Sequence, residues 1–136
     1  MKPPSSPALH VAPRRVLLLD DDRFMLDVLR DMFDVLDGGG SFDIHAEFDA
    51  RRALKSLPRH APDFLVCDLA MPDMDGIEFL QAAAGQGFSG RVILVSALED
   101  GVRDAATELA RALGLQVAGA FRKPLAIEQL RLAVQC

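Results

Sequence analysis

The chain has 136 residues, with 15 Lys and Arg against 20 Asp and Glu for a net charge of −5, and half of its residues are hydrophobic. This length and balance predict one globular domain with a core of its own, and they exclude a disordered or fibrous chain. The acidic excess argues against nucleic-acid binding and against docking on anionic lipid, and no apolar run approaches the ~20 residues that span a bilayer, so we expect a cytoplasmic protein.

The first segment, Met1–Pro13, carries four of the eight prolines. A stretch of this composition buries too little apolar surface to offset the entropy lost on ordering, so we interpret it as a flexible arm. We therefore expect two parts, an arm over residues 1–13 and a single folded domain over residues 14–136.

From Arg14 onward, short apolar runs alternate with apolar residues at helical spacing. The runs at 16–19, 64–67 and 92–95 are continuously apolar, which is typical of strands buried on both faces. Weaker strands are predicted at 42–46 and 117–121. The spacing predicts helices over about 25–36, 50–57, 77–84, 102–113 and 127–134. The second helix is expected to end before Pro58, because proline disfavours helical backbone in the residue before it.

Five strand–helix units in succession predict an α/β fold, a doubly wound parallel sheet with helices on both faces. In such sheets, ligands bind outside the carboxyl ends of the strands. The predicted strands end in Asp20-Asp21-Asp22, in Asp68 and in Ser96, and Lys123 follows the last strand. We therefore expect a carboxylate cluster, one hydroxyl and one ammonium group at a single edge of the sheet.

This combination of groups points to phosphoryl chemistry. Crowded carboxylates need a proton or a cation at neutral pH, and an oxygen-rich site with few ligands suits Mg²⁺. One carboxylate could then attack a phosphoryl group while the metal, Ser96 and Lys123 hold its equatorial oxygens. Asp22, in contrast, stands at a position where an aspartate also serves as a helix cap.

Four pieces of the chain, in this order, resemble the receiver domain of a two-component response regulator. They are Leu18–Asp22, Val66–Gly76, Leu94–Ala97 and Lys123-Pro124. The resemblance covers Arg14 to the C-terminus. It implies a flavodoxin-like (βα)5 fold with strand order 2-1-3-4-5, and a domain that catalyses only its own phosphorylation and dephosphorylation.

The resemblance also implies roles for the residues at the strand ends. Asp68 would accept a phosphoryl group from a sensor histidine kinase or a histidine phosphotransfer protein. Asp21 would ligate Mg²⁺ directly and Asp20 would act close by or through water, while Asp68 and the backbone carbonyl of Ala70 would complete the protein ligands.

Two further residues would handle the phosphoryl group itself. Ser96 would donate its hydroxyl to a phosphoryl oxygen and swing inward after transfer. Lys123 would pair with the phosphate, aimed by a Lys123-Pro124 bond that is usually cis in this family. The new charge would change the surface of the fourth helix, fifth strand and fifth helix, and with it the binding of an effector protein or of an output domain outside this sequence. A phosphorylation-linked dimer is a further expectation.

Three positions depart from the usual receiver pattern. Ala120 stands where an aromatic residue is common, and Phe121 faces the other way because successive strand residues alternate. Ala70 and Leu98 flank the path of the hydrolytic water in receivers, and neither side chain can orient a water. We therefore expect slow self-dephosphorylation.

The segment Ala110–Leu125 is similar to receivers that precede a cyclic-di-GMP phosphodiesterase domain. Two alternative functions stay open at this point. A phosphorylation-independent interaction module with a receiver-like fold is favoured only by the missing aromatic residue. A haloacid-dehalogenase-like phosphatase would use Asp20 and Asp22, but Phe24 stands where that class has Thr, and Asp68 would have no role.

Overall fold

The computed structural model describes residues 13–37, 42–71 and 74–135. The predicted flexible arm therefore lies outside the described residues except for Pro13. Strands and helices alternate through the described chain. In order they are β2 (Arg14–Leu19), α2 (Arg23–Asp37), β3 (Phe42–Glu47), α3 (Ala50–His60), β4 (Phe64–Asp68), α4 (Gly76–Gly85), β5 (Arg91–Ser96), α5 (Asp100–Ala112), β6 (Gln116–Arg122) and α6 (Ile127–Gln135).

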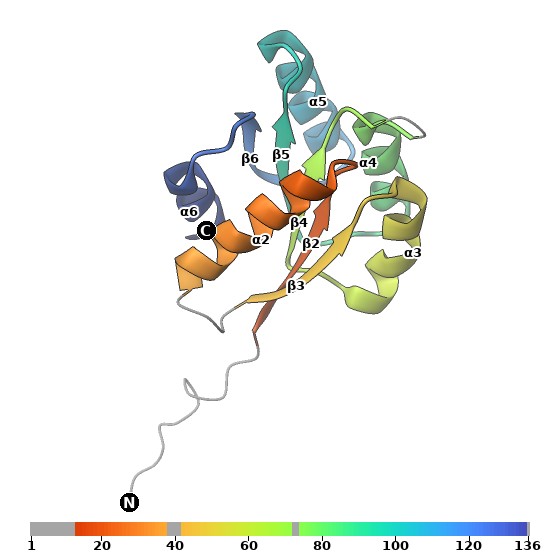
Figure 1. Cartoon of the computed structure of the whole chain (residues 1–136). Coiled ribbons are helices and arrows are strands. Elements are labelled where there is room, and N and C mark those ends of the chain that lie inside the picture. Colours follow the sequence, from red (N-terminus) through yellow and green to blue (C-terminus); the bar gives the residue numbers. More distant parts are fainter. Residues whose placement is uncertain (1–12, 38–41, 72–73, 136) are drawn as a thin grey trace, which may run out of the picture.

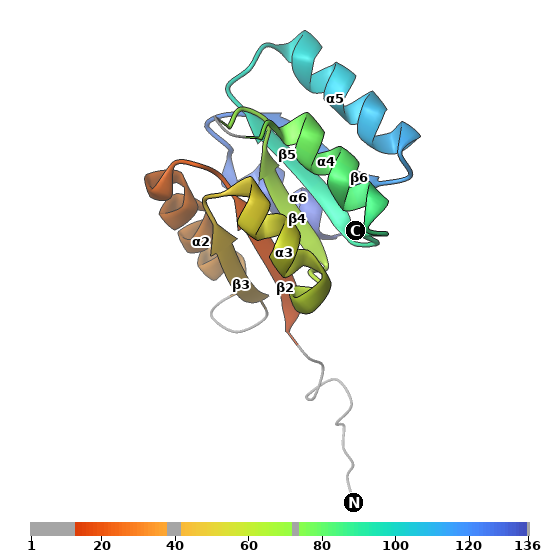
Figure 2. The same ribbon diagram turned by 90° about the vertical axis from the view of Figure 1, so that its right-hand side faces the viewer.

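The five strands form one parallel sheet in the order β3-β2-β4-β5-β6. This order confirms the predicted 2-1-3-4-5 topology. Helices α2 and α6 cover one face of the sheet, and α3, α4 and α5 cover the other (Figures 1 and 2). All strands run the same way, so their carboxyl ends share one edge, where the sequence predicts the functional residues.

The central strands are buried on both faces, as their continuous apolar runs predict. Leu17 and Leu65 pack toward α3, α4 and α5, whereas Val16 and Val66 pack toward α2 and α6. Burying an aliphatic side chain of this size contributes ~1.5–3 kcal/mol, so these strands form a rigid frame for the loops that follow them.

The prediction that the second helix ends before Pro58 is wrong. Helix α3 continues through Pro58 to His60 and ends at Ala61, which has a left-handed backbone with φ 46°. Proline has no N–H to donate to the carbonyl of Leu54. The side chain of Gln86 supplies that donor instead, with Nε2 lying 3.2 Å from the Leu54 oxygen. A hydrogen bond from outside the helix thus satisfies the carbonyl that the proline leaves open.

A register shift in β6 decides which way its last residues face. Val92 pairs with Val117 and Ile93 with Gly119, so one extra residue is inserted in β6. Beyond this bulge, Ala120 packs against the core beneath α3, α4 and α5, and Phe121 packs against the core on the α2–α6 side. Phe121 therefore does not occupy the position of the missing aromatic residue, in agreement with the prediction.

Candidate functional site

Three carboxylates meet at the carboxyl edge of the sheet. Asp20 follows β2, Asp21 comes next, and Asp68 is the last residue of β4. One side-chain oxygen from each lies within 4.8 Å of the other two. Asp20 and Asp68 are buried, while Asp21 is exposed. The expectation from strand order, that these side chains gather at one edge, is confirmed.

Backbone groups orient the two buried carboxylates. Oδ1 of Asp20 accepts a hydrogen bond from the Asp22 N–H at 2.9 Å, and the Asp20 N–H lies 3.3 Å from the Glu47 carbonyl. Oδ1 of Asp68 accepts from the Ala70 N–H at 3.1 Å. Each carboxylate thus has one oxygen fixed by the backbone and presents the other, Oδ2, to the site.

Lys123 bridges the two Oδ2 atoms. Its Nζ is 2.7 Å from Oδ2 of Asp20 and 3.5 Å from Oδ2 of Asp68. The Lys123–Pro124 peptide bond is cis, as the resemblance implies, and the Lys123 N–H donates to the Ser96 carbonyl at 3.0 Å. The lysine therefore reaches the acidic cluster from β6 and is tied to the end of β5.

The electrostatics of the site favour a further cation. Burial, together with the charge of Asp20, raises the pKa of Asp68 to about 6. The hydrogen bond from the Ala70 N–H and the charge of Lys123 act in the opposite direction and lower this pKa. Burial would lower the pKa of Lys123, but its hydrogen bond to Asp20 and the charges of both aspartates raise it instead. Carboxylate oxygens are hard donors, so Asp20, Asp21 and Asp68 fit a hard divalent ion.

Ser96 is fully buried at the end of β5. Its Oγ accepts a hydrogen bond from the Leu98 N–H at 3.0 Å. Among the described residues, this hydroxyl is turned toward the loop backbone and makes no hydrogen bond to Asp68. To act on a group attached to Asp68, the Ser96 side chain would have to rotate.

A hollow of about 540 Å³ opens beside the cluster. Apolar side chains make up most of its wall, with Asp21 and Asp75 as the acidic members. The apolar members are Leu69, Ala70, Met71, Ile77, Leu98 and Val102. Both positions that the sequence analysis singled out for water access, Ala70 and Leu98, thus line one apolar wall.

Two nearby aspartates serve the fold. Oδ1 of Asp22 accepts from the Phe24 N–H at 3.0 Å at the start of α2. Asp75 is the N-cap of α4 and accepts from the Glu78 N–H at 2.8 Å. The phosphatase alternative needs Asp22 as its acid, but the structure uses this carboxylate as a cap.

Gly76 is a site residue that the sequence reasoning missed. A Cβ at this position would lie 2.5 Å from Cα of Leu69 and 2.8 Å from the carbonyl oxygen of Asp68. The Gly76 N–H also donates to the Leu69 carbonyl at 2.9 Å. Helix α4 thus begins directly against the backbone that follows Asp68. The pair Asp75-Gly76, which stands directly before a helical pattern, is the sequence feature from which this tight helix start could have been predicted.

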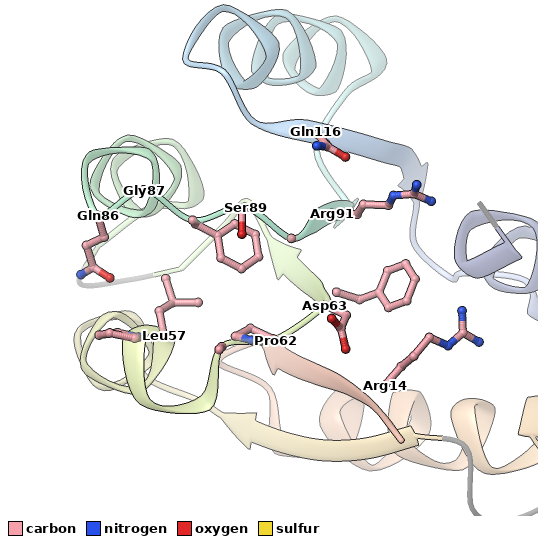
Figure 3. A pocket seen from close by; sticks show the side chains of 14 residues that line it. Arg14, Leu57, Pro62, Asp63, Gln86, Gly87, Ser89, Arg91 and Gln116 are labelled. Carbon is pink, nitrogen blue, oxygen red and sulfur yellow. The ribbon is translucent and has the colours of Figure 1, made fainter. Parts of the chain in front are cut away.

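A second cavity, of about 490 Å³, lies at the opposite edge of the sheet, where Figure 3 shows Arg14, Asp63 and Gln86. Arg14 donates to the Val134 carbonyl at 2.8 Å, and Asp63 accepts from the Arg15 N–H at 2.8 Å. Gln86 is engaged by helix α3, as described above. These three groups already hold the fold together, whereas Nη1 of Arg91 in the same wall is buried without a hydrogen-bond partner among the described residues. The carboxyl edge, where three carboxylates, a lysine and a serine gather, is the candidate site.

A family model described as the response regulator receiver domain matches residues 16–135. The chain belongs to this family. Its structure is similar to that of a response regulator from Colwellia psychrerythraea, with a TM-score of 0.74 and 30% identity over 92% of this chain and 100% of that chain. It is also similar to the CheX-CheY-BeF3-Mg²⁺ complex from Borrelia burgdorferi, with a TM-score of 0.74 and 26% identity over 91% of this chain and 88% of that chain.

Curated relatives share the receiver part. The Regulator of RpoS from Escherichia coli is 30% identical over 112 residues, which are 82% of this chain and 31% of that protein. The response regulator MprA from Mycobacterium tuberculosis is 28% identical over 116 residues, 85% of this chain and 46% of that protein. The chain thus spans less than half the length of these relatives.

This domain is therefore a receiver of two-component signalling, a family that is phosphorylated on an aspartate and works with histidine kinases. Within the described residues, no helix is both long and apolar enough to cross a membrane. The cytoplasmic location stays a prediction.

Proposed function

We propose that Asp68 is the phosphoacceptor of this receiver. One observation carries the proposal: Oδ2 of Asp68 faces the cluster with Lys123 Nζ at 3.5 Å, whereas Lys123 holds Oδ2 of Asp20 at 2.7 Å. Asp20 is thus engaged at both oxygens, and Asp68 keeps the looser one. Asp68 also ends the central strand, between the strands that carry Asp20 and Ser96.

Mg²⁺ is the proposed cofactor, held by the carboxylates of Asp20, Asp21 and Asp68 and the carbonyl of Ala70. When bound, the ion neutralises charge on the oxygens of the transferring group. The oxygen-only donor set supports this assignment, because soft and borderline metals prefer sulfur and nitrogen ligands.

The proposed transfer is an in-line displacement. The phosphorus–nitrogen bond of a phosphohistidine on the donor breaks as a bond from phosphorus to Oδ2 of Asp68 forms, and the histidine nitrogen keeps the electron pair. The Lys123 ammonium and the Ser96 hydroxyl hold the negatively charged equatorial oxygens. The donor is a sensor histidine kinase or a histidine phosphotransfer protein. The domain catalyses only this step and the later hydrolysis of its own acyl phosphate.

The proposed output lies outside the domain. We assign residues 14–136 to the receiver and residues 1–13 to an arm. The similarity of Ala110–Leu125 to receivers that precede cyclic-di-GMP phosphodiesterase domains supports an output domain of that kind. An effector protein bound by the α5–β6–α6 surface, or a phosphorylation-linked dimer, would also transmit the signal.

Intact-mass spectrometry tests the phosphoacceptor. The chain is incubated with MgCl2 and acetyl phosphate, and the mass of one phosphoryl group is expected to appear. Asp68→Asn should abolish the adduct. Asp22→Asn is the matched control, because it changes a neighbouring carboxylate that caps α2, and it should keep the adduct.

The opposite outcome supports a different function. If neither acetyl phosphate nor a phosphorylated histidine donor modifies the wild-type chain, the phosphoacceptor proposal is wrong. Ala120, in place of the usual aromatic residue, would then favour the phosphorylation-independent interaction module.

A further inference from the structure

A chain of hydrogen bonds leads from Ser96 to the first turn of α5. Oγ of Ser96 accepts from the Leu98 N–H at 3.0 Å, and the Leu98 carbonyl accepts from Nη1 of Arg103 at 2.8 Å. The same guanidinium pairs through Nη2 with the carboxylate of Asp100. The Leu98 residue is therefore held on its N–H by the serine and on its carbonyl by the arginine.

The guanidinium of Arg103 is well packed for a charged group. Its side chain is 11% exposed, whereas that of Asp100 is 71% exposed. Hydrogen bonds from charged donors are stronger than neutral ones, and two from one rigid guanidinium also fix direction. Arg103 thus fixes the position of the loop between β5 and α5.

Helix α5 begins without the usual side-chain cap. Its N-cap residue Glu99 makes no side-chain hydrogen bond to the helix among the described residues. The hydrogen bond from Arg103 to the Leu98 carbonyl provides a side-chain link between the loop and the helix. Within the described chain, the buried residues of α5 are Ala106 and Ala110. Because alanine buries less apolar area than a larger aliphatic side chain, these two residues add little to the anchoring of the helix on the sheet.

We propose that Arg103 is a positioning residue that holds the loop in the arrangement where the Ser96 hydroxyl accepts from the Leu98 N–H, and that Arg103 transmits the rotation of Ser96 to α5. This inference rests on the proposed function, in which Ser96 donates to a phosphoryl oxygen. Rotation of Ser96 toward Asp68 breaks its bond to Leu98, and Arg103 resists the accompanying movement of the Leu98 peptide. Ser96 is thus coupled to α5 through the charged side chain of Arg103, and not through an aromatic residue at position 120.

The test measures binding of beryllofluoride, an acyl phosphate analogue, in the presence of MgCl2. Calorimetry is the readout, because the chain has no Trp or Tyr for intrinsic fluorescence. Arg103→Gln should bind beryllofluoride about five- to tenfold more tightly than wild type, since the charged hydrogen bond that holds the Leu98 carbonyl is lost. Arg111→Gln is the matched control, with the same change on the exposed last turn of α5, and should bind as wild type does.

A double-mutant comparison separates positioning from a general structural effect. In a Ser96→Ala background, Arg103→Gln is expected to change the affinity less than twofold, because no hydroxyl remains to turn. Hydrogen exchange gives a second readout: the Leu98 amide should exchange faster in unliganded Arg103→Gln than in wild type. Asp100→Asn removes an exposed partner of Arg103, so it provides a milder variant if Arg103→Gln does not fold, with a smaller change in the same direction.

The outcomes separate the two proposals. Equal affinity of Arg103→Gln and Arg111→Gln would overturn the role of Arg103 alone, and so would tightening that persists without the Ser96 hydroxyl. Absence of beryllofluoride binding in the wild-type chain would overturn the proposed function, and this inference with it.

Discussion

Lys123 and Asp20 are 103 residues apart in the chain, yet Nζ of the lysine lies 2.7 Å from Oδ2 of the aspartate. The pair joins the residue after β2 to the residue after β6, across the ends of β4 and β5, the first of which carries Asp68. The lysine thereby supplies positive charge to a cluster of three carboxylates before any metal binds.

Replacing this lysine should weaken both the fold and the chemistry. Lys123→Met leaves the buried carboxylate of Asp20 without its partner, so we expect the metal-free protein to lose ~2 kcal/mol of stability at neutral pH. Addition of MgCl2 should restore part of it. Phosphorylation by acetyl phosphate should slow ~100-fold, because one group that holds the phosphoryl oxygens is gone.

Thermal unfolding with and without MgCl2, and intact mass over time, provide the measurements. Arg122→Met is the control, since it changes an exposed cation one residue earlier. Equal melting temperatures for Lys123→Met and Arg122→Met in metal-free buffer would contradict the prediction.

The lifetime of the acyl phosphate should depend on the apolar wall of the hollow beside the site. Ala70 and Leu98 cannot orient a water, so wild type is expected to keep its phosphoryl group for minutes or longer. Leu98→Glu places a carboxylate there and should speed hydrolysis ~10-fold. Leu98→Met, which keeps the wall apolar, should leave the rate unchanged. Loss of the wild-type adduct within seconds would show that water reaches the site by another path.

Gly76 should tolerate no side chain, because a Cβ would lie 2.5 Å from Cα of Leu69. We expect Gly76→Ala to destabilise the domain by ~2 kcal/mol and to weaken beryllofluoride binding. Gly85→Ala is the same change in the same helix, with nothing within 4 Å of the added Cβ, and should be neutral or stabilising by ~0.5 kcal/mol. Urea unfolding of both variants tests this. Similar losses in the two would rule out the close approach as the cause.

His60 should make the domain sensitive to mild acid. Burial lowers the pKa of His60, and so do the charges of His45 and Arg15, against the opposing effect of Asp43. Its ring lies 5.0 Å from that of His45, which pairs with Glu47 at 2.8 Å. The unfolded chain then binds this proton more tightly than the folded one, so stability is full above pH ~6.5 and falls as the pH drops through that value.

His60→Gln should remove this contribution and leave the opposite one of Asp68, whose raised pKa lowers stability as the pH rises to about 6. The measurement is the free energy of unfolding in urea between pH 5 and pH 8, for wild type and variant. Wild-type and variant curves that run parallel between pH 5 and pH 6.5 would refute the prediction.

The site could be predicted from sequence because its residues follow directly from strand ends. Asp20, Asp68 and Ser96 each end or follow a buried apolar run, and parallel strands bring such ends to one edge. The helix through Pro58 could not be predicted, because the bond that satisfies Leu54 comes from Gln86, 32 residues away. The bulge in β6 could not be predicted from the sequence either, because it appears only in the pairing of β6 with β5. The i, i+3 pair of Asp100 and Arg103 can be recognised in the sequence. The hydrogen bond from Arg103 to the Leu98 carbonyl cannot, because it depends on the conformation of the loop.

Three side chains of the candidate site share one local geometry. Asp20, Asp68 and Ser96 each accept a hydrogen bond from the N–H two residues later in the chain, at 2.9, 3.1 and 3.0 Å. These are Asx and Ser turns, which a short polar side chain forms with its own backbone. The orientation of each side chain is thus set within three consecutive residues, and the sheet brings the three side chains close together. The same turn therefore leaves Oδ2 of each aspartate facing the cluster and holds the Ser96 hydroxyl on its own loop, so the state in which only the serine must turn is written into the local sequence.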